Sequence, residues 1–165
     1  SLFKSSMKHF LTIFILTVIV QWSCLKAPEY PIEPIINFVG LTSEVMKQGA
    51  FNSDSTIITF SFTDGDGDLG DNDSVNIFLT DERIDTITTS FKIPLLSQSA
   101  GAKGISGEIA IKVYTTCCLF PNGQTPCTPS SQYPVDSLVY GIYIIDRGQH
   151  KSNIIYTPAI KLLCQ

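Results

Sequence analysis

Residues 57–63 read Ile57-Ile58-Thr59-Phe60-Ser61-Phe62-Thr63, and the next ten read Asp64-Gly65-Asp66-Gly67-Asp68-Leu69-Gly70-Asp71-Asn72-Asp73. At the end of the first run, aromatic side chains alternate with hydroxyl-bearing ones. This period of two, with β-branched and aromatic residues, predicts a half-buried β-strand. The second run is rich in glycine and aspartate, which favour turns, so we expect the strand to end in an acidic loop.

The same strand pattern recurs along most of the chain. We expect strands at 35–39, 57–63, 74–80, 86–93, 107–115, 138–145 and 153–163. After the first 23 residues, no stretch has the 3.6-residue apolar period of an amphipathic helix. These seven strands predict an all-β domain, an immunoglobulin-like antiparallel β-sandwich over residues 35–165. The alternative is a lipocalin-like barrel, which usually needs about eight longer strands.

Composition excludes several classes of protein. The chain has 165 residues, 44% of them apolar and 16% charged, which suits one packed domain better than a disordered chain. Its net charge of −4 argues against the basic face of a nucleic-acid-binding protein. Several apolar runs of about 20 residues would be needed for a multi-pass membrane protein, and the one long run lies near the N-terminus.

The N-terminal residues have the layout of a secretory signal peptide. Met7, Lys8 and His9 precede the apolar run from Phe10 to Val20, and a small residue, Ser23, follows shortly after. A helix of eleven residues spans about 16 Å, roughly half of the hydrocarbon core. We therefore expect residues 1–23 to be a cleaved signal peptide, of which residues 1–6 are an upstream extension.

The residue after Ser23 is a cysteine, Cys24. This arrangement resembles the lipobox of bacterial lipoproteins, and the resemblance implies that the thiol of Cys24 is acylated and becomes the mature N-terminus. The following residues to 34 are proline-rich and would form an extended tether. The alternative is an ordinary secretory signal, with Cys24 as a disulfide partner.

Five carboxylates crowd into residues 64–73, and they repel one another unless a cation neutralises them. Oxygen ligands at this density favour Ca²⁺, and the interleaved glycines let alternate side chains converge. The spacing of the first three aspartates resembles EF-hand, dockerin and thrombospondin type 3 loops. An EF-hand would have glycine where Leu69 stands and glutamate where Val75 stands, so we expect a calcium loop on a β-scaffold. The alternative is a solvated acidic hairpin turn. The candidate ligands in this loop are Asp64, Asp66, Asp68, Asp71 and Asp73.

A sixth candidate ligand follows from topology. In an immunoglobulin-like sandwich the loops after the second and sixth predicted strands gather at one end. Asp146 ends the strand at 138–145, so we expect it near the aspartate cluster, either as a ligand or with Arg147 pairing a carboxylate. The alternative is that Asp146 only starts a turn.

Four cysteines remain besides Cys24, namely Cys117, Cys118, Cys127 and Cys164. An even number in an exported chain favours disulfides. A bridge between the neighbours Cys117 and Cys118 would be strained, so we expect one to pair with Cys127 and the other with Cys164. The alternative, a zinc site, is disfavoured because adjacent cysteines cannot easily supply two tetrahedral ligands.

Evidence for catalysis is weak. His150 is the one histidine after the signal peptide, and neither a nucleophile motif nor a phosphate-binding loop is present. Tyrosines at six positions could form a sugar platform, but those on strands are better explained as core or face residues. They are Tyr30, Tyr114, Tyr133, Tyr140, Tyr143 and Tyr156.

Taken together, the lipobox-like Cys24, the proline-rich tether and the Phe62-to-Gly70 turn resemble the uncharacterised small surface lipoproteins of Bacteroidetes-type bacteria. That resemblance implies an outer-membrane lipoprotein, periplasmic or surface-exposed, with an immunoglobulin-like domain and no known reaction. We expect a calcium-stabilised binding or accessory module without catalytic activity. Its expected partners are the membrane, through the lipid, and an outer-membrane protein complex or a glycan, but no nucleic acid. One alternative is a carbohydrate-binding module of a glycan-uptake system, and a distant one is a hydrolase centred on His150.

Overall fold

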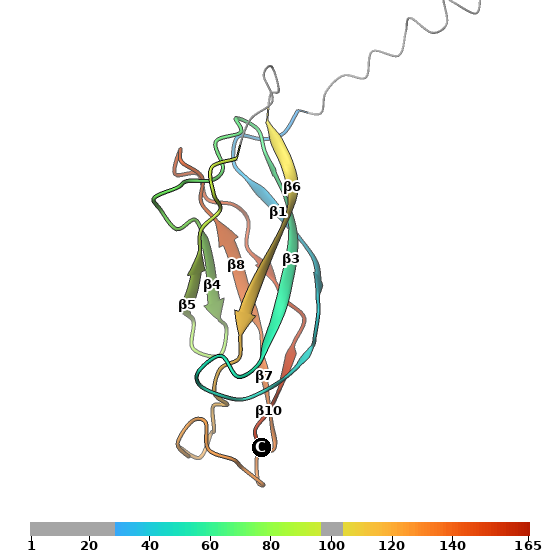
Figure 1. Cartoon of the computed structure of the whole chain (residues 1–165), viewed down its shortest axis with the longest axis vertical. Coiled ribbons are helices and arrows are strands. Elements are labelled where there is room, and N and C mark those ends of the chain that lie inside the picture. Colours follow the sequence, from blue (N-terminus) through green and yellow to red (C-terminus); the bar gives the residue numbers. More distant parts are fainter. Residues whose placement is uncertain (1–28, 97–103) are drawn as a thin grey trace, which may run out of the picture.

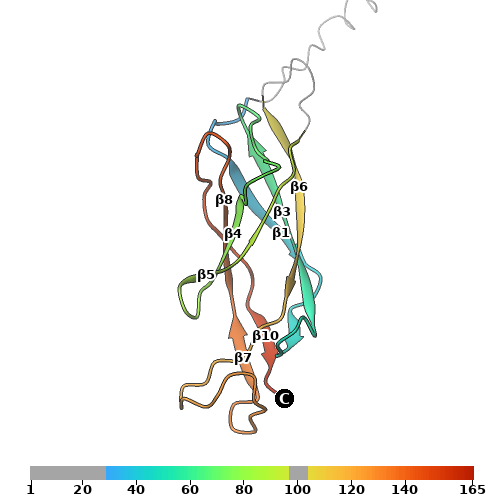
Figure 2. The same cartoon turned by 60° about the vertical axis from the view of Figure 1, so that its left-hand side comes forward.

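The computed structural model describes residues 29–96 and 104–165, so the predicted signal peptide, Cys24 and the first part of the tether lie outside the described residues. The described chain is all-β and contains no helix, and therefore none that is long and apolar enough to cross a bilayer. Figures 1 and 2 show an elongated body of strands. The strands are β1 (Ile35–Leu41), β2 (Val45–Lys47), β3 (Ser55–Asp64), β4 (Ile77–Asp81), β5 (Thr86–Phe91), β6 (Ile105–Tyr114), β7 (Val135–Leu138), β8 (Tyr140–Ile144), β9 (Ile155–Tyr156) and β10 (Ile160–Leu163).

The strands form three open sheets with the orders β1-β3-β6, β5-β4-β8-β9 and β2-β10-β7. All the strand pairs are antiparallel except β2 with β10, which is parallel. Because β5 and β6 are edge strands of two different sheets, the sheets do not close into a barrel. The arrangement is consistent with a β-sandwich, as expected from the sequence.

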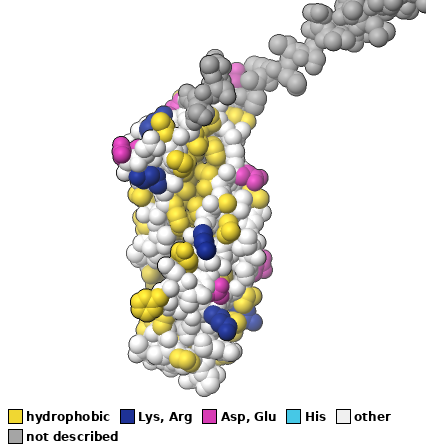
Figure 3. All heavy atoms as spheres, viewed as in Figure 1, with side chains coloured by type: hydrophobic (Ala, Val, Ile, Leu, Met, Phe, Trp, Pro, Cys, Tyr) yellow, Lys and Arg dark blue, Asp and Glu magenta, His cyan; other side chains and the backbone are white. Residues whose placement is uncertain are grey.

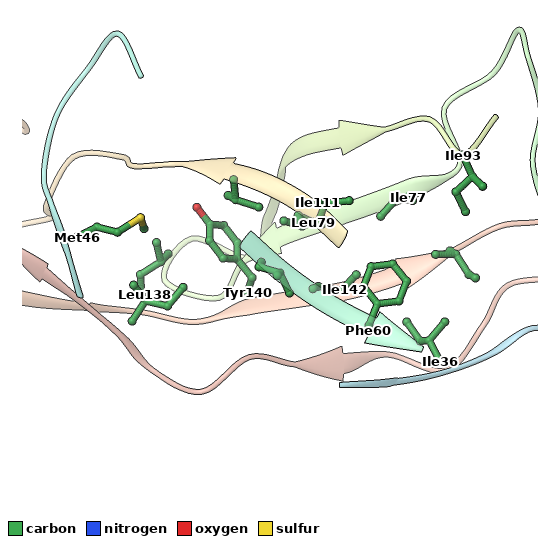
Figure 4. Close-up of a cluster of buried hydrophobic side chains, with 14 of the residues drawn as sticks. Ile36, Met46, Phe60, Ile77, Leu79, Ile93, Ile111, Leu138, Tyr140 and Ile142 are labelled. Carbon is green, nitrogen blue, oxygen red and sulfur yellow. The ribbon is translucent and has the colours of Figure 1, made fainter. Parts of the chain in front are cut away.

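The core lies between the sheets and follows the alternation that the sequence predicts. Ile58, Phe60 and Phe62 of β3 point inward and are buried, as are Leu79 of β4 and Ile142 of β8. Figure 4 shows the ring of Phe60 in β3 beside Ile142 of β8, from opposite sheets. Full burial of each large apolar side chain contributes roughly 1.5–3 kcal/mol before the entropy of ordering the chain is subtracted.

The last two predicted strands are each divided in two. The chain leaves one sheet at Val139, because β7 pairs with β10 whereas β8 pairs with β4 and β9. The final strand is interrupted around Pro158, which has no N–H for a ladder. Beside it Thr157 pairs with Tyr140, since its N–H donates to the Tyr140 carbonyl and its hydroxyl accepts from the Tyr140 N–H, both at 3.0 Å. The sequence therefore predicts where these strands lie but not their exchange between sheets, and it does not predict the short strand β2.

Two disulfides hold the long loop between β6 and β7. The structure pairs Cys117 with Cys127 and Cys118 with Cys164, which confirms the expected pattern and settles which neighbour takes which partner. Cys118 and Cys164 are fully buried. This loop lies at the lower end of the molecule in Figure 1, beside the C-terminus.

An ion-pair network that the sequence does not predict ties this loop to the β4–β5 hairpin. Arg83 donates to both carboxylate oxygens of Asp81 and reaches Asp136 at 2.6 Å. It also donates to the carbonyl of Cys117 at 3.2 Å. Burial alone would raise the pKa of the Asp136 carboxyl. The N–H of Leu119 and the Arg83 guanidinium together lower it by more, so this pKa lies below its ordinary value.

Candidate metal centre

Four aspartates converge at the upper end of the sandwich, opposite the disulfide-linked loop (Figure 1). Asp64, Asp66, Asp68 and Asp146 each offer a carboxylate oxygen, and these four oxygens lie within 4.8 Å of one another. We call this group the aspartate cluster. Three of its members follow one another at alternate positions, whereas Asp146 comes from the loop after β8, 78 residues beyond Asp68. The cluster could hold a metal ion.

Asp64 is aimed inward because it is the last residue of β3. It continues the buried side of that strand after Phe60 and Phe62, and it has no exposed surface. One of its oxygens, Oδ2, accepts a 2.9 Å hydrogen bond from the backbone N–H of Leu69. The Leu69 side chain is itself fully buried, so the core holds the loop that carries the cluster.

Asp146 is held by the turn that it starts. Its Oδ1 accepts from the backbone N–H of His150 at 2.7 Å, and its Oδ2 lies 2.9 Å from the Nδ1 of His150. The Asp146 side chain is fully buried, while His150 is 38% exposed. The hydrogen bond to Asp146 raises the pKa of His150, which favours the charged imidazolium next to the cluster.

Two oxygens of the cluster have no hydrogen-bond partner within the part of the chain that the structure describes. They are Oδ1 of Asp64 and Oδ1 of Asp68, and both are inaccessible to solvent. An unpaired buried carboxylate oxygen is costly, because it has lost its hydration without a replacement. A cation among the four carboxylates would give both oxygens a partner.

The pKa values reflect this unpaired charge. Burial, with smaller contributions from Asp66 and Asp68, raises the pKa of Asp64 to about 6. Burial also raises the pKa of Asp68, and the charges of Asp146 and Asp66 add to the effect. Both shifts describe a protein without metal, in which protons partly replace a cation.

The structure does not bring the other two predicted ligands to the cluster. Asp71 and Asp73 lie outside the four-residue group. Asp71 instead accepts from the N–H of Asp73 at 2.9 Å, and this bond lowers its pKa. Arg147, expected to pair with a carboxylate, donates to the carbonyl of Gly70 at 3.0 Å.

Neighbouring segments pack tightly against the loop that carries the cluster. A side chain on Gly65 would overlap the carbonyl oxygens of Tyr30 and Pro31, in the part of the predicted tether that the structure describes. One on Gly70 would overlap the carbonyl of Pro94, which follows β5. The glycines are therefore required for close backbone approach as well as for turning.

Comparisons with protein-family models, curated proteins and solved structures find no match to this chain. Function is therefore inferred from the residues themselves. Sequence reasoning missed the role of Leu69, although a leucine between acidic and glycine residues is the kind of signal that marks a loop anchored in the core.

Proposed function

We propose that the protein is a calcium-stabilised β-sandwich that serves as a binding or accessory module of the cell envelope, without catalytic activity. The observation that supports the calcium site most strongly is the pair of buried, unpartnered oxygens on Asp64 and Asp68. Both belong to a group of four converging carboxylates. A cation that joins the cluster would relieve this crowded negative charge at neutral pH.

Calcium fits this ligand set better than other common metals. All four donors are carboxylate oxygens, whereas zinc sites usually include cysteine or histidine. Ca²⁺ takes about six to eight oxygens in flexible geometry, and mono- or bidentate carboxylates can supply most of them. Mg²⁺ requires a stricter octahedron and usually keeps several of its waters.

We propose the immunoglobulin-like type of sandwich for the domain. One three-stranded sheet, β1-β3-β6, and one four-stranded sheet, β5-β4-β8-β9, agree with that type. The loop after β3 and the loop after β8 lie at one end, as the four-aspartate group requires. The short parallel pair of β2 with β10 would be a local addition to this plan.

A binding role is supported by a hollow next to the aspartate cluster. It has a volume of about 380 Å³ and is lined by residues of both loops, among them Asp71, Asn76, Asp146 and Arg147. An ion that joins the two loops would fix the shape of this surface. For attachment we propose acylation of Cys24 and an outer-membrane location, which rest on the lipobox-like sequence.

A calcium titration of the melting temperature tests the proposal. The protein is first stripped with a chelator and then returned to millimolar CaCl₂, and wild type is compared with Asp66→Asn and Asp73→Asn. We expect Ca²⁺ to raise the melting temperature of wild type and of Asp73→Asn, whose changed residue lies outside the cluster. Asp66→Asn should lose most of the response. No rise in wild type would refute the calcium site.

A further inference from the structure

A second hollow lies on the opposite half of the sandwich from the aspartate cluster. It occupies the open side between the edge strands β5 and β6 and has a volume of about 390 Å³. Figure 3 shows that hydrophobic side chains also reach the surface along the upper part of the same face. We call this hollow the β5–β6 cleft. Cavities of about 300–1,000 Å³ are the usual size for small-molecule ligands.

Tyr140 of β8 contributes an unusual group to the cleft. Its side chain lines the cleft although the residue is only 3% exposed. Figure 4 shows its ring packed among the apolar side chains near Leu138, with the hydroxyl oxygen in red at its outer end. No hydrogen bond within residues 29–96 and 104–165 uses this hydroxyl, which solvent in the cleft reaches, and a tyrosine hydroxyl in a protein interior normally has a partner. A ligand in the cleft would supply that partner.

The remaining lining favours a polar ligand with hydroxyl groups. Thr88 and Thr89 of β5 and Thr116 after β6 provide hydroxyls, while Phe91 and Tyr114 provide aromatic rings. Hydroxyl groups can both donate and accept hydrogen bonds, so they match a polyol without fixing one protonation state. Aromatic surfaces together with a few polar groups are typical of small-molecule sites.

The charges around the cleft favour a neutral ligand. Asp81 lies at the cleft, but Arg83 already binds both of its oxygens. Lys112 also lines the cleft, and its ammonium group lies over the Tyr114 ring at 5.3 Å from the centroid. Each of these charges already has a partner within the protein. A charged ligand would therefore gain little by binding here, because the charged side chains of the cleft already have partners.

We propose that the β5–β6 cleft binds the ring of a neutral sugar, with the Tyr140 hydroxyl as a hydrogen-bonding group. This site is separate from the aspartate cluster and does not depend on calcium being the bound ion. It gives the proposed binding module a ligand class that the cluster alone does not supply.

Saturation-transfer NMR with single sugars tests the site. The probes are glucose, galactose, mannose and N-acetylglucosamine, with glucuronic acid as a charged comparison, each measured with calcium and with a chelator. We expect transfer to at least one neutral sugar in both conditions. Tyr140→Phe removes one oxygen and no hydrogen bond of the side chain within the described residues, so its melting temperature should match wild type while binding weakens at least tenfold.

Tyr156→Phe is the matched control, because Tyr156 is exposed on β9 and does not line the cleft. It should bind sugar as wild type does. Absence of transfer to every neutral sugar overturns the proposal, and so does unchanged binding in Tyr140→Phe. Preference for glucuronic acid that Lys112→Gln abolishes would overturn the assignment of a neutral ligand. The calcium site is tested separately, by the effect of Ca²⁺ on the melting temperature. A negative result with sugars would therefore not count against the calcium site.

Discussion

The backbone N–H of Leu69 donates a 2.9 Å hydrogen bond to Oδ2 of Asp64, five residues earlier, and both residues are fully buried. This bond fixes the direction of the carboxylate, so that one oxygen is satisfied by the loop and the other faces the cluster without a partner. The apolar side chain of Leu69 thus anchors the charged loop to the core. Stability of the fold and occupancy of the cluster are therefore expected to be coupled.

Asp64→Asn separates the cost of the buried charge from the benefit of the ion. The asparagine oxygen can still accept from Leu69, and its amide can donate to a neighbouring carboxylate where Oδ1 has no partner. In chelator we expect the variant to have a higher melting temperature than wild type, which corresponds to a free energy of unfolding larger by about 1–2 kcal/mol. In calcium the order should reverse, because the variant lacks one negative ligand. Differential scanning calorimetry measures both.

The control for that variant is Asp73→Asn, which removes an exposed charge from the same loop outside the cluster. In calcium and in chelator alike, its free energy of unfolding should differ from that of wild type by no more than about 0.5 kcal/mol. If Asp64→Asn lowers stability in chelator, the buried carboxylate does not destabilise the metal-free protein, and the electrostatic account is wrong.

Metal-free protein should lose stability as the pH rises. Burial raises the pKa of Asp64 from 3.8 to about 6, so between these values the native state holds a proton that the unfolded state has released. The free energy of unfolding then falls with rising pH, by about 3 kcal/mol at most from this group. The raised pKa of His150 acts in the same direction at higher pH. Urea denaturation in chelator from about pH 4 to about pH 8 measures the slope, because this range includes the interval between the two pKa values of Asp64.

Calcium should reverse that slope, because the ion replaces protons on the carboxylates and binds more strongly as they ionise. The difference between the two curves should therefore widen with pH. Asp64→Asn in chelator should show a shallower slope than wild type. Identical slopes in wild type and variant would contradict the raised pKa.

Sequence reasoning located the strands because alternation reports which side of a strand is buried. Ile58, Phe60 and Phe62 are buried at the alternate positions that the pattern predicts. It could not locate the exchange of sheets at Val139, since a strand that changes partners keeps the same local pattern.

For the aspartate cluster, spacing alone predicted too many ligands in one loop. Alternation brings Asp64, Asp66 and Asp68 together, but Asp71 and Asp73, which follow Gly70, lie outside the group. The predicted order of the loops was enough to expect Asp146 near the cluster, because topology places distant segments side by side. The network of Arg83 with Asp81 and Asp136 depends on tertiary packing and leaves no mark in the local sequence.

Gly65→Ala should destabilise the protein through contact with the segment before β1. An alanine methyl group would overlap the carbonyl oxygens of Tyr30 and Pro31, and backbone atoms cannot move aside cheaply. We expect a loss of about 1–3 kcal/mol in urea denaturation. Gly40→Ala is the matched control, since a side chain there meets nothing within 4 Å. Equal effects of the two substitutions would contradict the packing described for the loop.

The two disulfides should differ in their contribution. Cys118 and Cys164 are separated by 46 residues, while Cys117 and Cys127 are separated by 10. Chain-entropy arguments give about 4 kcal/mol for the longer loop and about 3 kcal/mol for the shorter. Replacing Cys118 and Cys164 by alanine should therefore lower the free energy of unfolding more than replacing the other pair, because it also leaves a cavity in the core. Chemical denaturation of the two double variants tests this order.

The most direct test of the calcium site is a crystal structure of the protein grown in millimolar calcium. The account predicts density for one ion between Asp64, Asp66, Asp68 and Asp146, with an oxygen of each at about 2.3–2.6 Å and the Oδ1 atoms of Asp64 and Asp68 among its ligands. A map in which these carboxylates are spread into solvent, with only water between them at that concentration, would contradict it.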